Sequence, residues 1–109
     1  MSGASSEIAA HIPNLMDRSR FVGEGIRFVG AAREAAAAGL VIVDLDRCHE
    51  TEAFAALDGH TIGFGAHVDT QRLEAAEFAG FDDVMARSAF FRRLPDLLAE
   101  HRAGGNETG

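Results

Sequence analysis

Several residue types are absent or scarce in this chain of 109 residues: there is no Lys, Trp or Tyr, only two Pro, and a single Cys. The single cysteine, Cys48, cannot form an internal disulfide, which fits a reducing cytoplasm. No apolar run approaches the roughly 18 residues that a transmembrane helix needs. The opening segment MSGASSE has neither the basic nor the apolar part of a secretion signal. We therefore expect a soluble, cytoplasmic protein that does not enter a membrane.

The charged residues are acidic in balance, with ten Arg against seventeen Asp and Glu and a net charge of −7. An acidic surface without basic clusters repels phosphate backbones, so nucleic acid is not an expected partner. Apolar residues make up 47% of the chain, which excludes a disordered protein. Because twenty of them are Ala, the core must be built from eight Leu, eight Phe, six Val and five Ile.

The length fits one domain, since domains cluster around 100 to 150 residues. Both ends are rich in small and polar residues, so we predict a disordered N-terminus over 1–6 and a flexible C-terminal tail over 103–109. The ordered domain is then 7–102, and neither a repeat nor a linker interrupts it.

Short apolar runs alternate with longer helical patterns along this domain. The predicted strands are 7–12, 26–30, 40–45, 60–68 and 82–87, and the predicted helices are 14–21, 31–39, 49–57, 70–80 and 91–102. Five β-α units in succession require a mainly parallel sheet with helices on both faces. We predict a flavodoxin-like three-layer sandwich with strand order 2-1-3-4-5.

Three finer predictions follow from local patterns. The run LVIVDL over 40–45 is apolar on consecutive residues, which indicates a central strand buried on both faces. The helix over 70–80 is predicted to turn Leu73, Ala76 and Phe78 inward, and the last helix its leucines at 94, 97 and 98. Pro95 fits best in the first turn of that last helix, where its missing N–H costs nothing.

Open parallel sheets carry their sites beyond the carboxyl ends of the strands, so that edge holds the candidate residues. Asp44 ends the apolar third strand, where it is either a nucleophile or metal ligand, or an acid that caps the following helix. Asp46, on the same loop, is the better candidate for such a cap. Cys48, His49 and His67 lie near the same edge, but their spacing matches no metal motif. We therefore predict no metal site and no cofactor, with the two histidines in solvated loops.

Other chemical motifs are incomplete. Gly63 and Gly65 form a GxG that no third glycine extends to the GxGxxG of nucleotide sites. Cys48 lies in an acidic loop, which raises a thiol pKa, and no GxSxG elbow is present. The sequence thus predicts no catalytic residue. Phe90 and Phe91 precede the last helix, and they either pack in the core or form part of a partner-binding surface.

The chain resembles the receiver domain of bacterial two-component response regulators, most specifically in LVIVDLD, GHTIGFGAHVD and AGFDDVMARSAFFRRLPDLL. The resemblance implies that Asp44 stands at the phosphoacceptor position. It also identifies four departures. Residues 12–14 replace an acidic pair that helps to hold Mg²⁺, Gly65 replaces a Thr or Ser, Arg87 replaces the Lys, and Ser88 replaces a cis-proline.

These departures remove groups that phosphoryl transfer needs: acids that share a divalent cation, a hydroxyl, and a compact ammonium group. Asp17 and Asp46 are the acids available as substitute metal ligands. The resemblance therefore implies a degenerate receiver, in which Arg87 is predicted to lock Asp44 in a salt bridge.

We therefore expect a stand-alone signalling module, not an enzyme, that binds a protein partner or itself. The expected interaction surface contains Arg72, Phe90, Phe91, Arg92 and Arg93. Two alternatives stay open: a working receiver phosphorylated on Asp44, and a small flavodoxin-like enzyme or ligand-binding domain that uses His49 and His67.

Overall fold

A five-stranded sheet forms the centre of the protein. The computed structural model describes residues 7–21 and 24–107. All neighbouring strands are parallel, and their order is β2-β1-β3-β4-β5, which confirms the predicted topology. The strands are β1 (Ile8–His11), β2 (Ile26–Phe28), β3 (Leu40–Asp44), β4 (His60–Gly65) and β5 (Asp83–Ala86).

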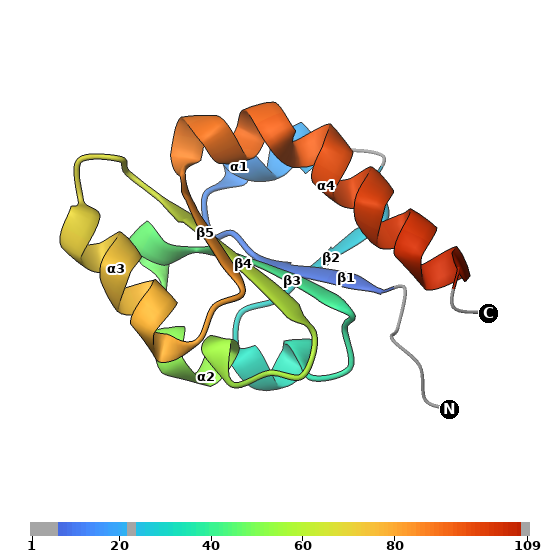
Figure 1. Ribbon diagram of the computed structural model, residues 1–109, viewed down its shortest axis with the longest axis horizontal. Coiled ribbons are helices and arrows are strands. Elements are labelled where there is room, and N and C mark those ends of the chain that lie inside the picture. The colour runs from blue at the N-terminus through green and yellow to red at the C-terminus, as the bar shows by residue number, and fades with distance from the viewer. Residues whose placement is uncertain (1–6, 22–23, 108–109) are drawn as a thin grey trace.

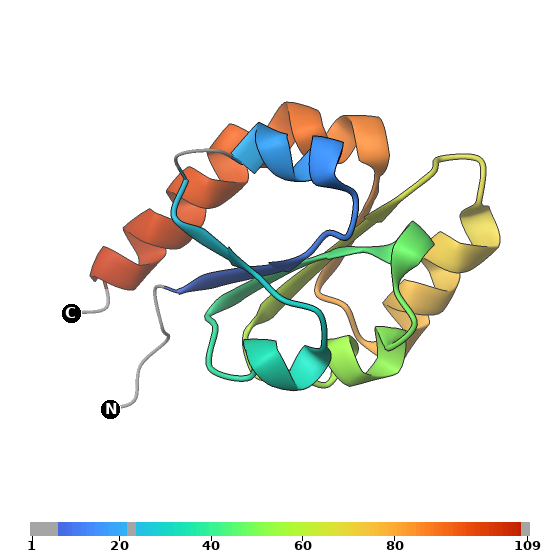
Figure 2. The same cartoon turned by 180° about the vertical axis from the view of Figure 1, so that it is seen from behind.

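Helices cover both faces of this sheet. They are α1 (Leu15–Arg18), α2 (Thr51–Ala55), α3 (Thr70–Ala79) and α4 (Arg87–Glu107), with the short 3-10 helices η1 (Ser19–Phe21), η2 (Ala32–Ala35) and η3 (Leu45–Arg47). Figures 1 and 2 show α1 and α4 over one face of the sheet, with α2 and α3 over the other. The result is the three-layer α/β arrangement of a flavodoxin-like fold.

The face under α4 is packed with large side chains. Phe90 of α4 is fully buried and stacks on Phe64 of β4, with ring centroids 4.5 Å apart. Leu94, Leu97 and Leu98 are buried on the same face, as their helical spacing predicted. Burial of such side chains contributes about 1.5–3 kcal/mol each, so this face anchors α4 firmly to the sheet.

The opposite face is packed with a mixture of alanines and larger apolar residues. All five residues of β3 are buried, which confirms its central position. Ala32 and Ala35 of η2 lie against β1 and β3 in a cluster that also contains Phe54. Because alanine extends no further than Cβ, the segment over 31–39 can lie close to the sheet, and it forms one short 3-10 helix there, not the expected longer helix.

The last helix differs from its predicted limits. It begins at Arg87, directly after β5, and continues to Glu107, so Pro95 lies inside the helix and not in its first turn. Pro95 has no N–H to donate to the carbonyl of Phe91, but the buried leucines on the other side hold the helix to the sheet. Although α4 is long, no helix among the described residues is apolar enough to cross a membrane.

The inward face of α3 also differs from the prediction. Ala76 is buried and Leu73 is half-buried, but the Phe78 side chain is 95% exposed. Successive residues of an α-helix are about 100° apart, so positions 76 and 78 point about 200° apart and cannot share one face. The expectation for Phe78 was therefore wrong.

Candidate functional site

Asp44 lies at the carboxyl end of β3, and the chain covers it completely, leaving none of its surface exposed. Its Oδ1 accepts a hydrogen bond from the Asp46 backbone N–H at 3.1 Å, and Arg47 Nη1 donates to its Oδ2 at 3.3 Å. Asp44 thus caps η3, the turn that directly follows its own strand. Burial raises the pKa of Asp44, although the nearby Arg47 partly opposes this effect.

Asp46 connects the η3 turn to the next strand. Its Oδ2 accepts a hydrogen bond from the Ala66 N–H at 3.0 Å, just after β4. A Cβ on Gly65 would lie 3.2 Å from Asp46 Oδ1, closer than side chains ordinarily pack. The absence of a side chain at Gly65 therefore lets the Asp46 carboxylate occupy the space in front of this strand end.

Arg72 on α3 donates hydrogen bonds to groups in the same region. Its Nε donates to Asp69 Oδ2 at 2.8 Å and its Nη1 donates to the Leu45 carbonyl at 3.1 Å. The same Nε is 3.6 Å from Asp46 Oδ1. The hydrogen bonds from Arg72 lower the pKa of Asp69, which also caps α3. Arg72 was predicted to be an interaction residue, but its guanidinium is engaged by groups of its own chain.

The predicted salt bridge between Arg87 and Asp44 is wrong. Arg87 Nη2 instead donates to Asp17 Oδ1, and this hydrogen bond joins the start of α4 to α1. The Asp17 side chain is only 6% exposed, and within the described part of the chain its Oδ2 is buried without a hydrogen-bond partner. Asn14 caps α1 by accepting from the Asp17 N–H, which turns Asp17 inward. Asp44 lies under η3, where Arg47 is the nearer cation.

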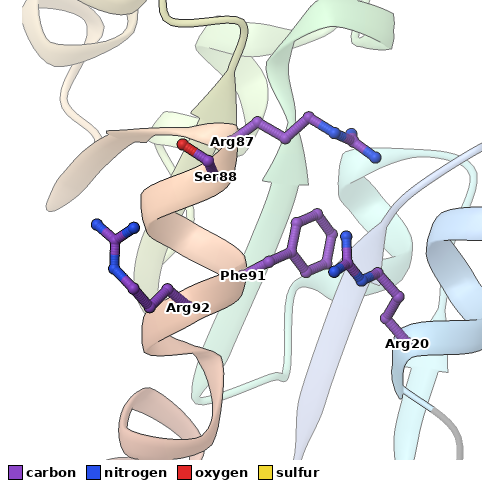
Figure 3. A pocket seen from close by; sticks show the side chains of 5 residues that line it. All are labelled: Arg20, Arg87, Ser88, Phe91 and Arg92. Atoms are coloured by element: carbon purple, nitrogen blue, oxygen red, sulfur yellow. The ribbon is translucent and has the colours of Figure 1, made fainter.

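The residues of the expected interaction surface differ in how far they are exposed to solvent. Phe90 is fully buried, which is the core-packing alternative, so it cannot contribute contact area. Arg92 and Arg93 are exposed, and Phe91 is half-buried. Phe91 also lines a pocket of about 380 Å³, shown in Figure 3, together with Arg20, Arg87, Ser88 and Arg92.

Sequence reasoning had passed over Arg20, which reaches this pocket from η1. The available signal was the recurrence of arginine at 18 and 20 on a segment that a β-α fold places beside the last helix.

The residues considered as metal ligands do not form a cluster. Among residues 7–21 and 24–107, no three His, Cys, Asp or Glu side chains are arranged to hold a metal ion. His49 and His67 are exposed, and Cys48 is half-buried. Burial raises the pKa of the Cys48 thiol, which disfavours the reactive thiolate.

No protein-family model matches the chain, and a search of curated proteins finds no match. The function must therefore be argued from the fold and from the geometry of the carboxyl edge.

Proposed function

We propose that this domain is a receiver-like signalling module that acts by binding a protein without accepting phosphate. The observation that carries this proposal is the state of Asp44, whose carboxylate is fully buried with both oxygens hydrogen-bonded. A carboxylate attacks phosphorus through a free oxygen lone pair that faces the donor. Neither Asp44 oxygen faces solvent, so a phosphodonor cannot reach it.

The surroundings of Asp44 support the same conclusion. The Asp46 carboxylate already accepts the Ala66 N–H, so this donor is not free for a phosphoryl oxygen. A second negative charge at this position repels an anionic donor. Transfer would require η3 to open and Arg72 to release its bonds to Asp69 and the Leu45 carbonyl.

The acids of this edge are neutralised by arginines in place of a metal. Asp17 is bound by Arg87, Asp44 by Arg47, and Asp46 lies beside Arg72. Mg²⁺ binds through several oxygen ligands in a strict octahedral geometry, and each of these carboxylates already has an arginine neighbour. The arrangement favours one fixed conformation over a switch driven by phosphate and Mg²⁺.

The edge of the sheet at β5, with α3 on one face and α4 on the other (Figure 1), offers contacts for a protein. Phe78 on α3 is an exposed aromatic side chain, and Arg92 and Arg93 on α4 are exposed cations. Aromatic residues and arginine supply most of the binding energy at protein interfaces. We therefore assign partner binding, or self-association, to this surface.

Incubation with acetyl phosphate and Mg²⁺, followed by intact-mass spectrometry, tests the chemical part of the proposal. The expected result is an unmodified protein. A phosphorylated protein would carry an adduct of about 80 Da, the mass of one phosphoryl group. The control is Asp58→Asn, which removes an exposed acid. If the adduct persists in this control but disappears in Asp44→Asn, the domain is a working receiver. If both variants keep the adduct, another residue carries it and Asp44 is unreactive, as proposed.

A further inference from the structure

The pocket between η1 and the first two turns of α4 has an unusual lining for an acidic protein. It is formed by Arg20, Arg87, Ser88, Phe91 and Arg92, and its volume is about 380 Å³. In Figure 3, Arg87 and Phe91 project from α4 toward Arg20, while Arg92 extends from the other side of the helix. The residues that line this one cavity therefore carry three guanidinium groups and one hydroxyl.

The charges at this pocket are only partly balanced. Of the three arginines, Arg87 is paired with Asp17, but Arg20 and Arg92 form no ion pair with any acid in the described part of the chain. The more distant Asp44 and Asp46 have arginine neighbours of their own. Two of the three arginines that line the pocket thus have no acidic partner among the described residues, on a chain whose net charge is −7.

Phe91 holds two of the three arginines, Arg20 and Arg87, in place. The guanidinium carbon of Arg20 is 4.2 Å from the centre of the Phe91 ring, and that of Arg87 is 5.2 Å from it. Stacking on an aromatic ring holds a guanidinium in position while leaving its N–H groups free to donate. The two arginines are therefore oriented before any ligand arrives, which lowers the entropy cost of binding.

We infer that this pocket binds the phosphate group of a small phosphate monoester. A phosphate monoester is close to a dianion at pH 7, which matches the two uncompensated charges, and its three terminal oxygens accept from guanidinium forks and from the Ser88 hydroxyl. A volume of about 380 Å³ exceeds the need of a phosphate alone, so the Phe91 edge contacts a small organic part.

This inference does not depend on the proposed function. The pocket lies on the α1 side of α4, and none of its lining residues belongs to the network of Asp44, Asp46 and Arg72. Ligand binding here is a reversible contact and leaves Asp44 unmodified. Failure of this inference and failure of the proposal on Asp44 are therefore separate results.

Titration of the ¹⁵N-labelled protein, followed by its amide signals, tests the site with three probes: phenyl phosphate, inorganic phosphate and benzoate. We expect saturable shifts at Ser88 and Arg20 with phenyl phosphate, at a Kd of about 1 mM or tighter. Inorganic phosphate should bind the same residues more weakly, and benzoate at least about tenfold more weakly than phenyl phosphate. Saturation by benzoate at the same concentration, or no saturable shift with any probe, overturns the inference.

Three variants locate the binding. Arg20→Gln and Arg92→Gln should each weaken phenyl phosphate binding about tenfold, because each removes one charge-assisted contact. Arg93→Gln is the matched control, since Arg93 is exposed beside Arg92 but does not line the pocket, and it should change the Kd less than about twofold. Equal weakening by Arg92→Gln and Arg93→Gln would mean general surface attraction and contradict a site. All three positions are exposed, so each variant should melt like the unaltered protein.

Discussion

At the scale of single residues, burial and pairing at the carboxyl edge decide what each acid can do. Asp44 is fully buried and depends on the half-exposed Arg47, whereas the buried Asp17 is held by Arg87 across two helices. A buried carboxylate costs free energy unless its charge is balanced and its oxygens are hydrogen-bonded. Replacing Asp44 by a neutral amide should therefore raise the free energy of unfolding, whereas removing Arg87, the partner of Asp17, should lower it.

The first residue-scale prediction concerns pH and Asp44. Because burial raises the pKa of Asp44 above its ordinary value of 3.8, the stability that this group contributes is full below that value. It is lost as the pH rises through the folded-state pKa. Asp44→Asn, which keeps an oxygen for the Asp46 N–H, should therefore be about 1 kcal/mol more stable at pH 7. The difference should shrink as the pH approaches 4 in urea unfolding.

Asp58→Asn, at an exposed turn, is the control and should change stability little at either pH. If Asp44→Asn is clearly less stable than the unaltered protein at pH 7, the fold stabilises the ionised carboxylate and this account of Asp44 is wrong.

The second prediction concerns Arg87. Arg87→Ala leaves the Asp17 carboxylate buried and unpaired, and should lower the free energy of unfolding by about 2 kcal/mol. This is less than for a fully buried pair, because the Arg87 side chain is 37% exposed. Adding Asp17→Asn should recover part of the loss. Arg102→Ala, which breaks an exposed pair with Glu24, should lower the free energy of unfolding by less than about 0.5 kcal/mol. Equal losses in the two variants would show that the pair of Asp17 and Arg87 stabilises the fold no more than an exposed pair does.

At the scale of elements, α4 shows how packing overrides a local preference. The helix passes through Pro95 because Phe90, Leu94 and Leu98 are buried on the sheet on either side of it. Proline in a helix interior removes one backbone hydrogen bond and crowds the preceding turn, which costs about 3 kcal/mol in an isolated helix. The burial of the leucine face outweighs that cost, and it also places Arg87 and Phe91 on the pocket side.

The element-scale prediction follows directly. Pro95→Ala should raise the free energy of unfolding by about 1–3 kcal/mol, because an alanine N–H at this position would donate to the Phe91 carbonyl and the crowding by the proline ring would be relieved. Denaturant unfolding measures it. Asp96→Ala, at the exposed neighbouring position, should gain no more than about 0.7 kcal/mol from helix preference alone. A Pro95→Ala protein that is no more stable would indicate that the chain is not helical through this position.

At the scale of the whole molecule, the two faces of the sheet are covered by different sets of side chains. Large side chains fill the α4 face, whereas the face under η2, α2 and α3 combines five alanines with valines, Leu45, Phe54 and Phe81. On the outside of this second layer, Phe78 leaves an aromatic ring 95% exposed to solvent. An exposed phenylalanine contributes nothing to the core, and the proposed function makes this ring a contact for a partner protein.

The whole-molecule prediction separates folding from association. Phe78→Ser should change the free energy of unfolding by less than about 0.5 kcal/mol, because the ring is almost fully exposed to solvent. It should abolish self-association in sedimentation measurements, or capture of the partner recovered from host lysate. Leu15→Ser is the matched control, since Leu15 is an exposed apolar residue on α1. Equal effects of the two variants, or retained association in Phe78→Ser, would remove α3 from the interface.

The sequence by itself determined the sheet. Consecutive apolar residues in β3 are stable only between two layers, and five β-α units leave few topologies, so the strand order followed from patterns local to each segment. The exposure of Phe78 was also within reach, because helical phase already separates positions 76 and 78.

Only the tertiary structure decided which arginine meets which acid. Asp17 and Arg87 are 70 positions apart, and their contact depends on α1 being one turn long and on α4 starting directly after β5. Element lengths are determined by packing, and a shift of one residue rotates a side chain on a helix by about 100°. Pairing between distant side chains therefore has no local sequence signature. The burial and pairing of Asp44 and Asp17, and the pocket beside Arg20, arise only when the helices pack on the sheet.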